Sequence, residues 1–227
     1  MTDDELPLLG GRVTADVVRI GNTVRRPPRM NAEFVHALLD HLAAAGFEGA
    51  PRFLGTDERG RDILSYIEGE VPADLGWHGD DVLVAAARLI RRFHDATVGL
   101  VTRESTAPLE VVCHNDLSPC NFVFRAGVPV ALIDFDTAAP GTRRMDLGYA
   151  AWGWLDLGDP DMDITPEEQR RRLRLFAAAY GNDISATSIK EAIVDRQQWL
   201  AAEGEHTGRT AMAQWARHCR AWTLRNL

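Results

Sequence analysis

The sequence predicts an α+β protein with two lobes: a small antiparallel sheet with one helix, then a mainly helical part. Two observations carry this prediction. Residues 1–69 hold short β-branched runs that glycine and proline interrupt, with one helical pattern among them. After Gly69, apolar residues recur mostly with a helical period. In a chain of 227 residues, which is long enough to bury a core, we therefore expect lobes at 1–69 and 70–227.

The front lobe is expected to contain several short strands and one helix. Gly21-Asn22 is a turn signal between two of the strand patterns. The strand patterns cover residues 6–9, 15–20, 23–26, 52–54 and 62–67. The helix is predicted from Asn31, a typical capping residue, to Ala45, with Gly46 ending it.

The rear lobe is predicted to be helical around a few short strands. Pro166 suits the first position of a helix and Gly181 suits a helix end. The helical patterns cover residues 80–97, 145–157, 166–180, 185–202 and 209–226. The strand patterns cover 110–113, 121–125 and 128–133.

Composition excludes some classes of function. The net charge of −8 argues against nucleic acid or an anionic membrane as the main partner. The longest apolar stretch, 82–90, contains Arg88 and is too short to span a bilayer. No basic segment precedes an apolar run at the start, so we expect a cytoplasmic protein.

Three cysteines without framework spacing favour packed thiols over a Cys/His metal site. The oligomeric state stays open.

Two neighbouring segments carry the residues suited to chemistry. The first has His114, Asp116 and Asn121, with Pro119 restricting the backbone between them, which predicts an ordered loop. The second places Asp134 and Asp136 directly after an apolar strand. Phosphoryl transfer needs such a set, since catalysis consists of positioning and charge neutralisation. Asn121 and Asp134 would hold Mg²⁺, Asp116 would accept the acceptor's proton, and His114 would brace the loop. Alternatively, Asp116 and Asp134 only satisfy turn backbones.

This pattern resembles the aminoglycoside phosphotransferase and choline kinase superfamily, small-molecule relatives of the protein kinases. There the catalytic loop reads His-x-Asp-x-x-x-x-Asn and an Ile-Asp-x-Asp segment follows. The resemblance implies a protein-kinase-like fold, with Asp116 and His114 in the catalytic loop, Asn121 and Asp134 as metal ligands, and Asp136 as a second metal contact or a surface residue. Asp146, in the helical segment that follows, would steady the loop.

The resemblance also implies ATP or GTP as co-substrate, but the nucleotide-binding part departs from the family. Lys190, the sequence's one lysine, lies far from the front lobe, so Arg25 is expected at the phosphate-contacting position, with Arg26 as the alternative. Its partner on the helix is undecided between Glu33 and His36. The phosphate-covering loop is reduced to residues 10–14, which also suit a plain hairpin turn. The backbone of Ser65, Tyr66 and Ile67 would form the hinge that binds the purine.

On the acceptor side, acidic residues are concentrated at 156–168, either as an attraction for amine-bearing substrates or as a solvated loop and helix start. The tryptophans fit a core better than a ligand cage. These features predict a kinase that phosphorylates a hydroxyl of a small molecule, possible acceptors being an aminoglycoside or another amine. The alternative is a catalytically weak nucleotide-binding or immunity-type module of the same fold, motivated by the missing lysine.

Overall fold

The computed structural model describes residues 5–8, 17–101, 109–158, 164–181 and 183–227. Its front lobe is a five-stranded antiparallel sheet in the order β1-β2-β3-β5-β4. Hairpins join neighbouring strands at the turns Gly21-Asn22 and 57–61, as the glycine signals predict. The strands are β1 (Leu6–Pro7), β2 (Val18–Ile20), β3 (Thr23–Arg26), β4 (Phe53–Thr56) and β5 (Asp62–Ser65).

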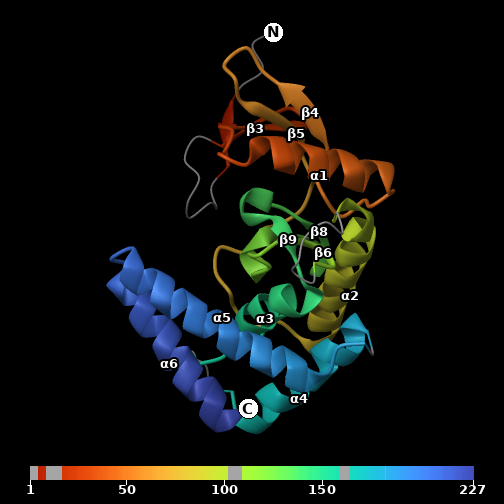
Figure 1. The fold of residues 1–227 in the computed structure, drawn as a ribbon. Coiled ribbons are helices and arrows are strands. Elements are labelled where there is room, and N and C mark those ends of the chain that lie inside the picture. The colour runs from red at the N-terminus through yellow and green to blue at the C-terminus, as the bar shows by residue number, and fades with distance from the viewer. Residues whose placement is uncertain (1–4, 9–16, 102–108, 159–163, 182) are drawn as a thin grey trace.

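Helix α1 (Ala32–Ala44) follows β3 and is the helix predicted for this lobe (Figure 1). Leu38, Leu39 and Leu42 are buried and recur with helical spacing, so one face of α1 packs into the core. Asn31 stands at the capping position, yet its side chain makes no capping bond. Its amide donates instead to the backbone oxygen of Asp136, 2.7 Å away in the rear lobe.

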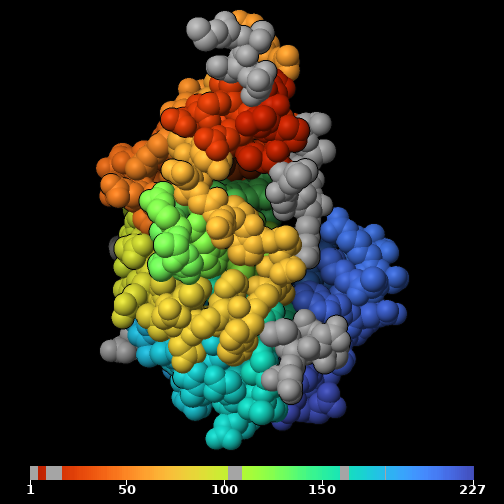
Figure 2. Space-filling view, turned by 180° about the vertical axis from the view of Figure 1, so that it is seen from behind, coloured from red at the N-terminus to blue at the C-terminus, as the bar shows by residue number. Residues whose placement is uncertain are grey.

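The lobes are joined where the chain leaves β5. The backbones of Glu70 and Phe124 exchange two hydrogen bonds, of 2.8 and 2.7 Å. Gly69 has φ +151°, and a Cβ there would lie 2.4 Å from the Phe124 carbonyl oxygen, so only glycine fits. Figure 2 shows the segment between β5 and α2, in gold, on the surface between the red and orange front lobe and the helical rear. The boundary at residue 69 stays a prediction.

In the rear lobe, helices surround two small sheets (Figure 1). Strand β6 (Val111–Cys113) pairs with β9 (Ala139–Gly141), and β7 (Phe122–Arg125) pairs with β8 (Val128–Leu132). Short 3₁₀ turns are η1 (Val98–Leu100), η2 (Pro119–Asn121) and η3 (Phe135–Thr137). The helices are α2 (Asp80–Thr97), α3 (Arg143–Trp154), α4 (Pro166–Tyr180), α5 (Ala186–His206) and α6 (Thr210–Asn226).

Most rear-lobe elements match the sequence patterns, and the start of α3 is a difference with a local cause. α3 begins at Arg143 because the Thr142 hydroxyl accepts a hydrogen bond from the Met145 amide and caps the helix. α3 and α5 approach closely: a Cβ on Gly148 would lie 2.7 Å from the Ala192 backbone.

The described part of the chain has no helix long and apolar enough to cross a membrane.

Candidate functional site

A cavity of about 520 Å³ lies where the segment after β3 faces the two motif segments. Asp116, Asp134 and Asp136 all line it, so the two sequence motifs converge on one space. The remaining lining residues are Arg29, Met30, Asn31 and Thr137. The cavity therefore has carboxylates on the rear-lobe side and two front-lobe side chains, of Arg29 and Asn31, that bond to Asp136 across it.

Asp146 fixes the loop that carries Asp116. It is fully buried, and its two carboxylate oxygens accept the backbone N–H groups of His114 and Asn115, both at 2.8 Å. Asn115 has φ +65°, a left-handed conformation that Asn tolerates better than most residues. His114 is also buried, and its Nε2 lies 2.9 Å from the Ile133 backbone oxygen. Thus Asp146 and His114 lie where loop-bracing roles require them.

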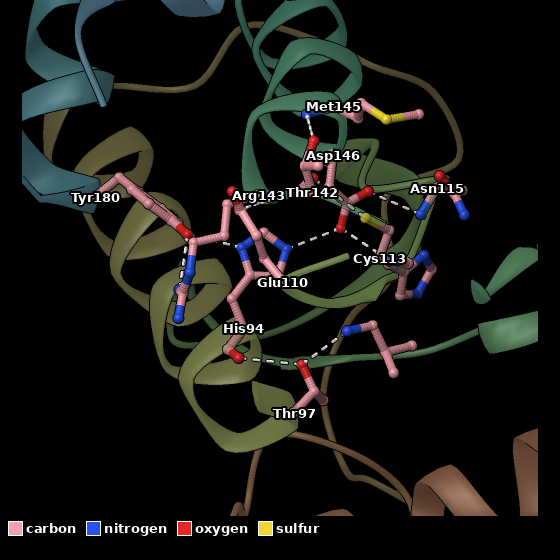
Figure 3. A network of polar contacts seen from close by, with 12 residues as sticks. His94, Thr97, Glu110, Cys113, Asn115, Thr142, Arg143, Met145, Asp146 and Tyr180 are labelled. Atoms are coloured by element: carbon pink, nitrogen blue, oxygen red, sulfur yellow. Dashed lines mark hydrogen bonds and ion pairs between the residues drawn. The ribbon is translucent and has the colours of Figure 1, made fainter. Parts of the chain in front are cut away.

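A chain of polar contacts links Asp146 through His94 and Tyr180 to Arg143 (Figure 3). His94 Nε2 lies 2.9 Å from Asp146, His94 Nδ1 lies 2.8 Å from the Tyr180 hydroxyl, and Arg143 donates to that hydroxyl at 3.0 Å. Burial raises the pKa of Asp146, but the hydrogen bond from His94 and the loop amides outweigh it and hold that pKa below the usual value. Asp146 therefore stays an anion that can accept all these bonds.

Asp116 has a partner that the sequence analysis missed. The Tyr149 hydroxyl donates to Asp116 Oδ1 at 2.7 Å. Burial, together with the Asp116 carboxylate, raises the Tyr149 pKa, so this hydroxyl keeps its proton and orients the carboxylate. The available signal was spacing: Tyr149 lies three residues after Asp146 on α3, on the same face of the helix.

Asn121 lies next to the segment that carries Asp134, although it is not among the residues that line the cavity. The Ile133 amide donates to the Asn121 backbone oxygen at 2.9 Å, which brings Asn121 beside the residue before Asp134. The Asn121 amide nitrogen donates to the Asp116 backbone oxygen at 2.8 Å, which leaves its side-chain oxygen as an acceptor. Asp134 adopts a left-handed conformation, φ +62°, that sets its carboxylate into the cavity.

This donor set fits a magnesium–nucleotide better than a metal held by protein alone. Among the described residues, no three His, Cys, Asp or Glu side chains are grouped as a metal cage. One carboxylate and one amide oxygen are the few protein ligands that Mg²⁺ takes when phosphate oxygens and waters complete its shell.

Arg26, the alternative to Arg25, is the arginine of β3 that reaches the motif residues. Its guanidinium lies 3.4 Å from Asp134 Oδ1 and also contacts Asp136. Neighbouring residues of a strand point to opposite faces. Arg25 accordingly lies elsewhere, 3.8 Å from Asp57 in the turn before β5. Arg29 adds a second cation, 3.1 Å from Asp136.

Glu33 and His36 were the two candidates on α1 for a partner of the phosphate-contacting arginine. Among the described residues, neither side chain forms a hydrogen bond or ion pair with Arg25 or Arg26. His36 Nε2 lies 2.9 Å from Asp62, and its ring stacks on Phe53 at 3.7 Å. Asp62 is the cross-strand neighbour of Arg26 on β5, so His36 reaches the arginine's strand through Asp62. Glu33 is exposed in the first turn of α1.

Two of the three predicted hinge residues already use their backbone N–H groups in hydrogen bonds within the front lobe. The Ser65 amide donates to Arg52 and the Tyr66 amide donates to Asn22, both at 2.9 Å, while Arg19 covers the Tyr66 ring at 3.7 Å. Within the described chain, the Ile67 amide has no protein partner. Of the three predicted hinge residues, Ile67 is thus the one whose N–H could meet a purine. Residues 10–14, the predicted phosphate loop, lie outside the described residues.

The acids expected to attract an amine are largely engaged or outside the described residues. Glu168 is held by Arg171 at 2.6 Å, which fits the reading of a structural helix start. Asp156 is buried. The positions that lie outside the described residues are Asp159, Asp161 and Asp163.

The tryptophans fall into two groups. Trp152 and Trp154 are core residues as expected, whereas Trp199 and Trp215 are exposed.

Comparisons with known proteins agree with this geometry. Residues 102–188 match the model of the Phosphotransferase enzyme family. A curated relative, the Trifolitoxin immunity protein of Rhizobium leguminosarum bv. trifolii, is 36% identical over 173 residues, which cover 70% of this chain and 66% of that protein. The chain thus spans just under two thirds of the length of this relative.

Solved structures share the fold at low sequence identity. The GDP complex of wild-type aminoglycoside 2'-phosphotransferase-IIIa superposes with a TM-score of 0.63 at 14% identity, over 99% of this chain and 93% of that one. Choline kinase from Cryptosporidium parvum Iowa II gives 0.66 at 11% identity, over 98% and 88%. The resemblance is therefore confirmed for the fold: the chain has the two-lobed, protein-kinase-like α+β fold of these aminoglycoside phosphotransferase and choline kinase structures.

Proposed function

We propose that this protein is a phosphotransferase that moves the terminal phosphoryl group of ATP or GTP to a hydroxyl of a small molecule. One observation carries the proposal: Asp116, Asp134 and Asp136, from two separate segments, line a single cavity between the lobes. The family match and the nucleotide complexes among the similar structures support it.

In this proposal the acceptor hydroxyl oxygen attacks the terminal phosphorus, and the bond from phosphorus to the bridging oxygen of the nucleoside diphosphate breaks. Asp116, oriented by Tyr149, receives the hydroxyl proton. Asn121 and Asp134 are the residues that would hold Mg²⁺, which neutralises phosphate charge when bound. Asp146 and His114 keep the loop in register, and Ile67 is the donor toward the purine.

Arg26 is the residue we propose as the phosphate contact, in place of Arg25. Its guanidinium already lies beside the proposed magnesium ligand, as a phosphate-binding cation should. Arginine binds phosphate through two parallel N–H donors, so it can substitute for the family's lysine with a different geometry. Binding of the magnesium nucleotide then replaces the Arg26–Asp134 pair by an Arg26–phosphate contact.

Mg²⁺-dependent nucleotide binding and turnover test the proposal. In a thermal-shift assay, ATP or GTP with Mg²⁺ should raise the melting temperature, because a ligand of the folded state stabilises it. With an acceptor panel, nucleoside diphosphate should be released only when an acceptor is present. If neither nucleotide binds with or without Mg²⁺, the proposal is wrong.

Arg26→Ala should raise KM for the nucleotide by about tenfold or more, since a charge-assisted contact worth about 1.5–3 kcal/mol is lost. Arg26→Lys should keep part of the affinity, because the charge remains. Arg25→Ala is the matched control and should leave KM nearly unchanged. A larger effect at Arg25 than at Arg26 would restore Arg25 as the phosphate contact.

A protective role is a second candidate, favoured by the 36% identical relative named as an immunity protein. Protection could act through phosphorylation of a toxin or through binding alone. Expression in trifolitoxin-sensitive cells separates the two: Asp116→Asn should abolish protection that depends on phosphoryl transfer and preserve protection that depends on binding. No protection by the wild-type protein would remove this candidate for that toxin.

A further inference from the structure

Arg196, on α5, lies against the catalytic loop. Its Nη2 donates to the backbone oxygen of Asn115, the residue before Asp116, at 3.2 Å. The guanidinium also lies over two aromatic rings, 4.9 Å from the centre of Tyr149 and 4.4 Å from that of Trp199. Since Tyr149 is itself bonded to Asp116, these contacts fix a cation beside the proposed catalytic base.

Within the described parts of the chain, Arg196 forms no ion pair at contact distance, although the carboxylates of Asp116 and Asp146 act on its charge from farther away. Other arginines near this region form such pairs: Arg144 is paired with Asp195 at 3.0 Å and Arg143 with Asp95 at 2.7 Å. Arg196 Nε is buried and makes no hydrogen bond to a described residue. A half-buried guanidinium is stabilised by an anion that reaches its remaining Nη–H donors.

Aromatic side chains extend the surface next to Arg196. Trp199 is 51% exposed and Trp215 is 44% exposed, so both rings present apolar surface to solvent. Trp215 stacks on Trp152 at 4.5 Å, and Trp152 meets Tyr149 edge-on at 6.4 Å. A row of rings therefore leads from the partner of Asp116 to the surface.

We propose that Arg196, Trp199 and Trp215 form the acceptor subsite, and that the acceptor is an alcohol with a flat apolar part and an anionic group, a carboxylate in the simplest case. The inference rests on the proposed phosphotransferase function and names its substrate class. Arg196 pairs with the anion, the rings cover the apolar part, and the hydroxyl reaches Asp116. A polycationic amino sugar is disfavoured at this subsite, because its ammonium groups would meet the Arg196 guanidinium.

A matched set of aryl alcohols tests the subsite by calorimetry in the presence of Mg²⁺ and a non-hydrolysable ATP analogue. The probes are 3-phenyllactate, its amide and 1-amino-3-phenylpropan-2-ol, which carry a carboxylate, a neutral amide and an ammonium group. The carboxylate should bind at least tenfold more tightly than the ammonium compound, with the amide between them. Kanamycin should bind more weakly than 3-phenyllactate.

Arg196→Gln should abolish the preference for the carboxylate, whereas Arg196→Lys, which keeps the charge, should retain part of it. Arg144→Gln changes a nearby, partly exposed arginine that is paired with Asp195; it removes the same charge and should leave the preference intact. Circular dichroism confirms that each variant is folded. Nucleotide binding is measured separately, so that its failure is attributed to the proposed function and not to the subsite.

In protein that binds the magnesium nucleotide, three outcomes would overturn the inference: equal binding of the three probes, tighter binding of the ammonium compound, or no binding of any probe. So would an unchanged carboxylate preference in folded Arg196→Gln protein.

Discussion

Asp116→Asn should lower the rate of phosphoryl transfer by about 10²–10⁴-fold, because the amide cannot accept the acceptor's proton. Nucleotide affinity should change little, since Asp116 faces the acceptor and the proposed metal ligands are Asn121 and Asp134. The substitution is nearly isosteric, and the Tyr149 hydroxyl can donate to the new amide oxygen as it does to the carboxylate. The measurement is kcat for nucleotide consumption with acceptor, beside the Kd for the magnesium nucleotide.

A structural contact and a control variant make the result interpretable. The Asn121 side chain bonds to the backbone oxygen of Asp116, so this contact survives the substitution and the loop should keep its shape. Tyr149→Phe removes only the orienting hydroxyl and should lower kcat less than Asp116→Asn does. A rate within threefold of wild type for Asp116→Asn would show that another group takes the proton.

Asp146→Asn should have the largest effect on stability, lowering the free energy of unfolding by about 3–5 kcal/mol. The carboxylate accepts hydrogen bonds from two loop amides and lies 2.9 Å from His94, and Asp146, His94 and His114 are all buried. An asparagine offers one oxygen and directs its NH₂ group at a backbone donor. Urea unfolding at pH 7 measures the change. Asp195→Asn, an exposed carboxylate paired with Arg144, should cost less than about 1 kcal/mol.

The same carboxylate predicts a pH dependence of stability. Its pKa in the folded protein lies below its ordinary value: burial raises that pKa, and the hydrogen bonds from His94 and the loop outweigh burial. The unfolded chain therefore binds the proton more readily, so the contribution is complete above about pH 4 and is lost as the pH falls through the folded pKa. Asp146→Asn should flatten the fall in stability below pH 4. An equally steep fall in the variant would assign it to other groups.

The fold was predictable because local signals agree with the tertiary arrangement. Helices α2 and α4 have the predicted limits, since an apolar stripe, Pro166 and Gly181 mark them independently. Strand β9 was missed because Ala139, Pro140 and Gly141 have low strand propensity and pair only through β6. Such a strand is determined by its partner and not by its own sequence.

The site was predictable as far as it lies in contiguous motifs. Asp116, Asp134 and Asp136 lie on one cavity because their segments are short and adjacent. The proposal of Arg26 over Arg25 needed the strand's orientation, which the sequence does not provide. His94 and Arg196 come from distant helices and lack motif signals, so only the packing of α2 and α5 reveals them.

A crystal structure with Mg²⁺ and a non-hydrolysable ATP analogue tests the central claim most directly. We predict the ion on the side-chain oxygens of Asn121 and Asp134, the terminal phosphate facing Asp116, and Arg26 on phosphate instead of on Asp134. A nucleotide bound away from this cavity, or an ion that touches neither Asn121 nor Asp134, would contradict the account.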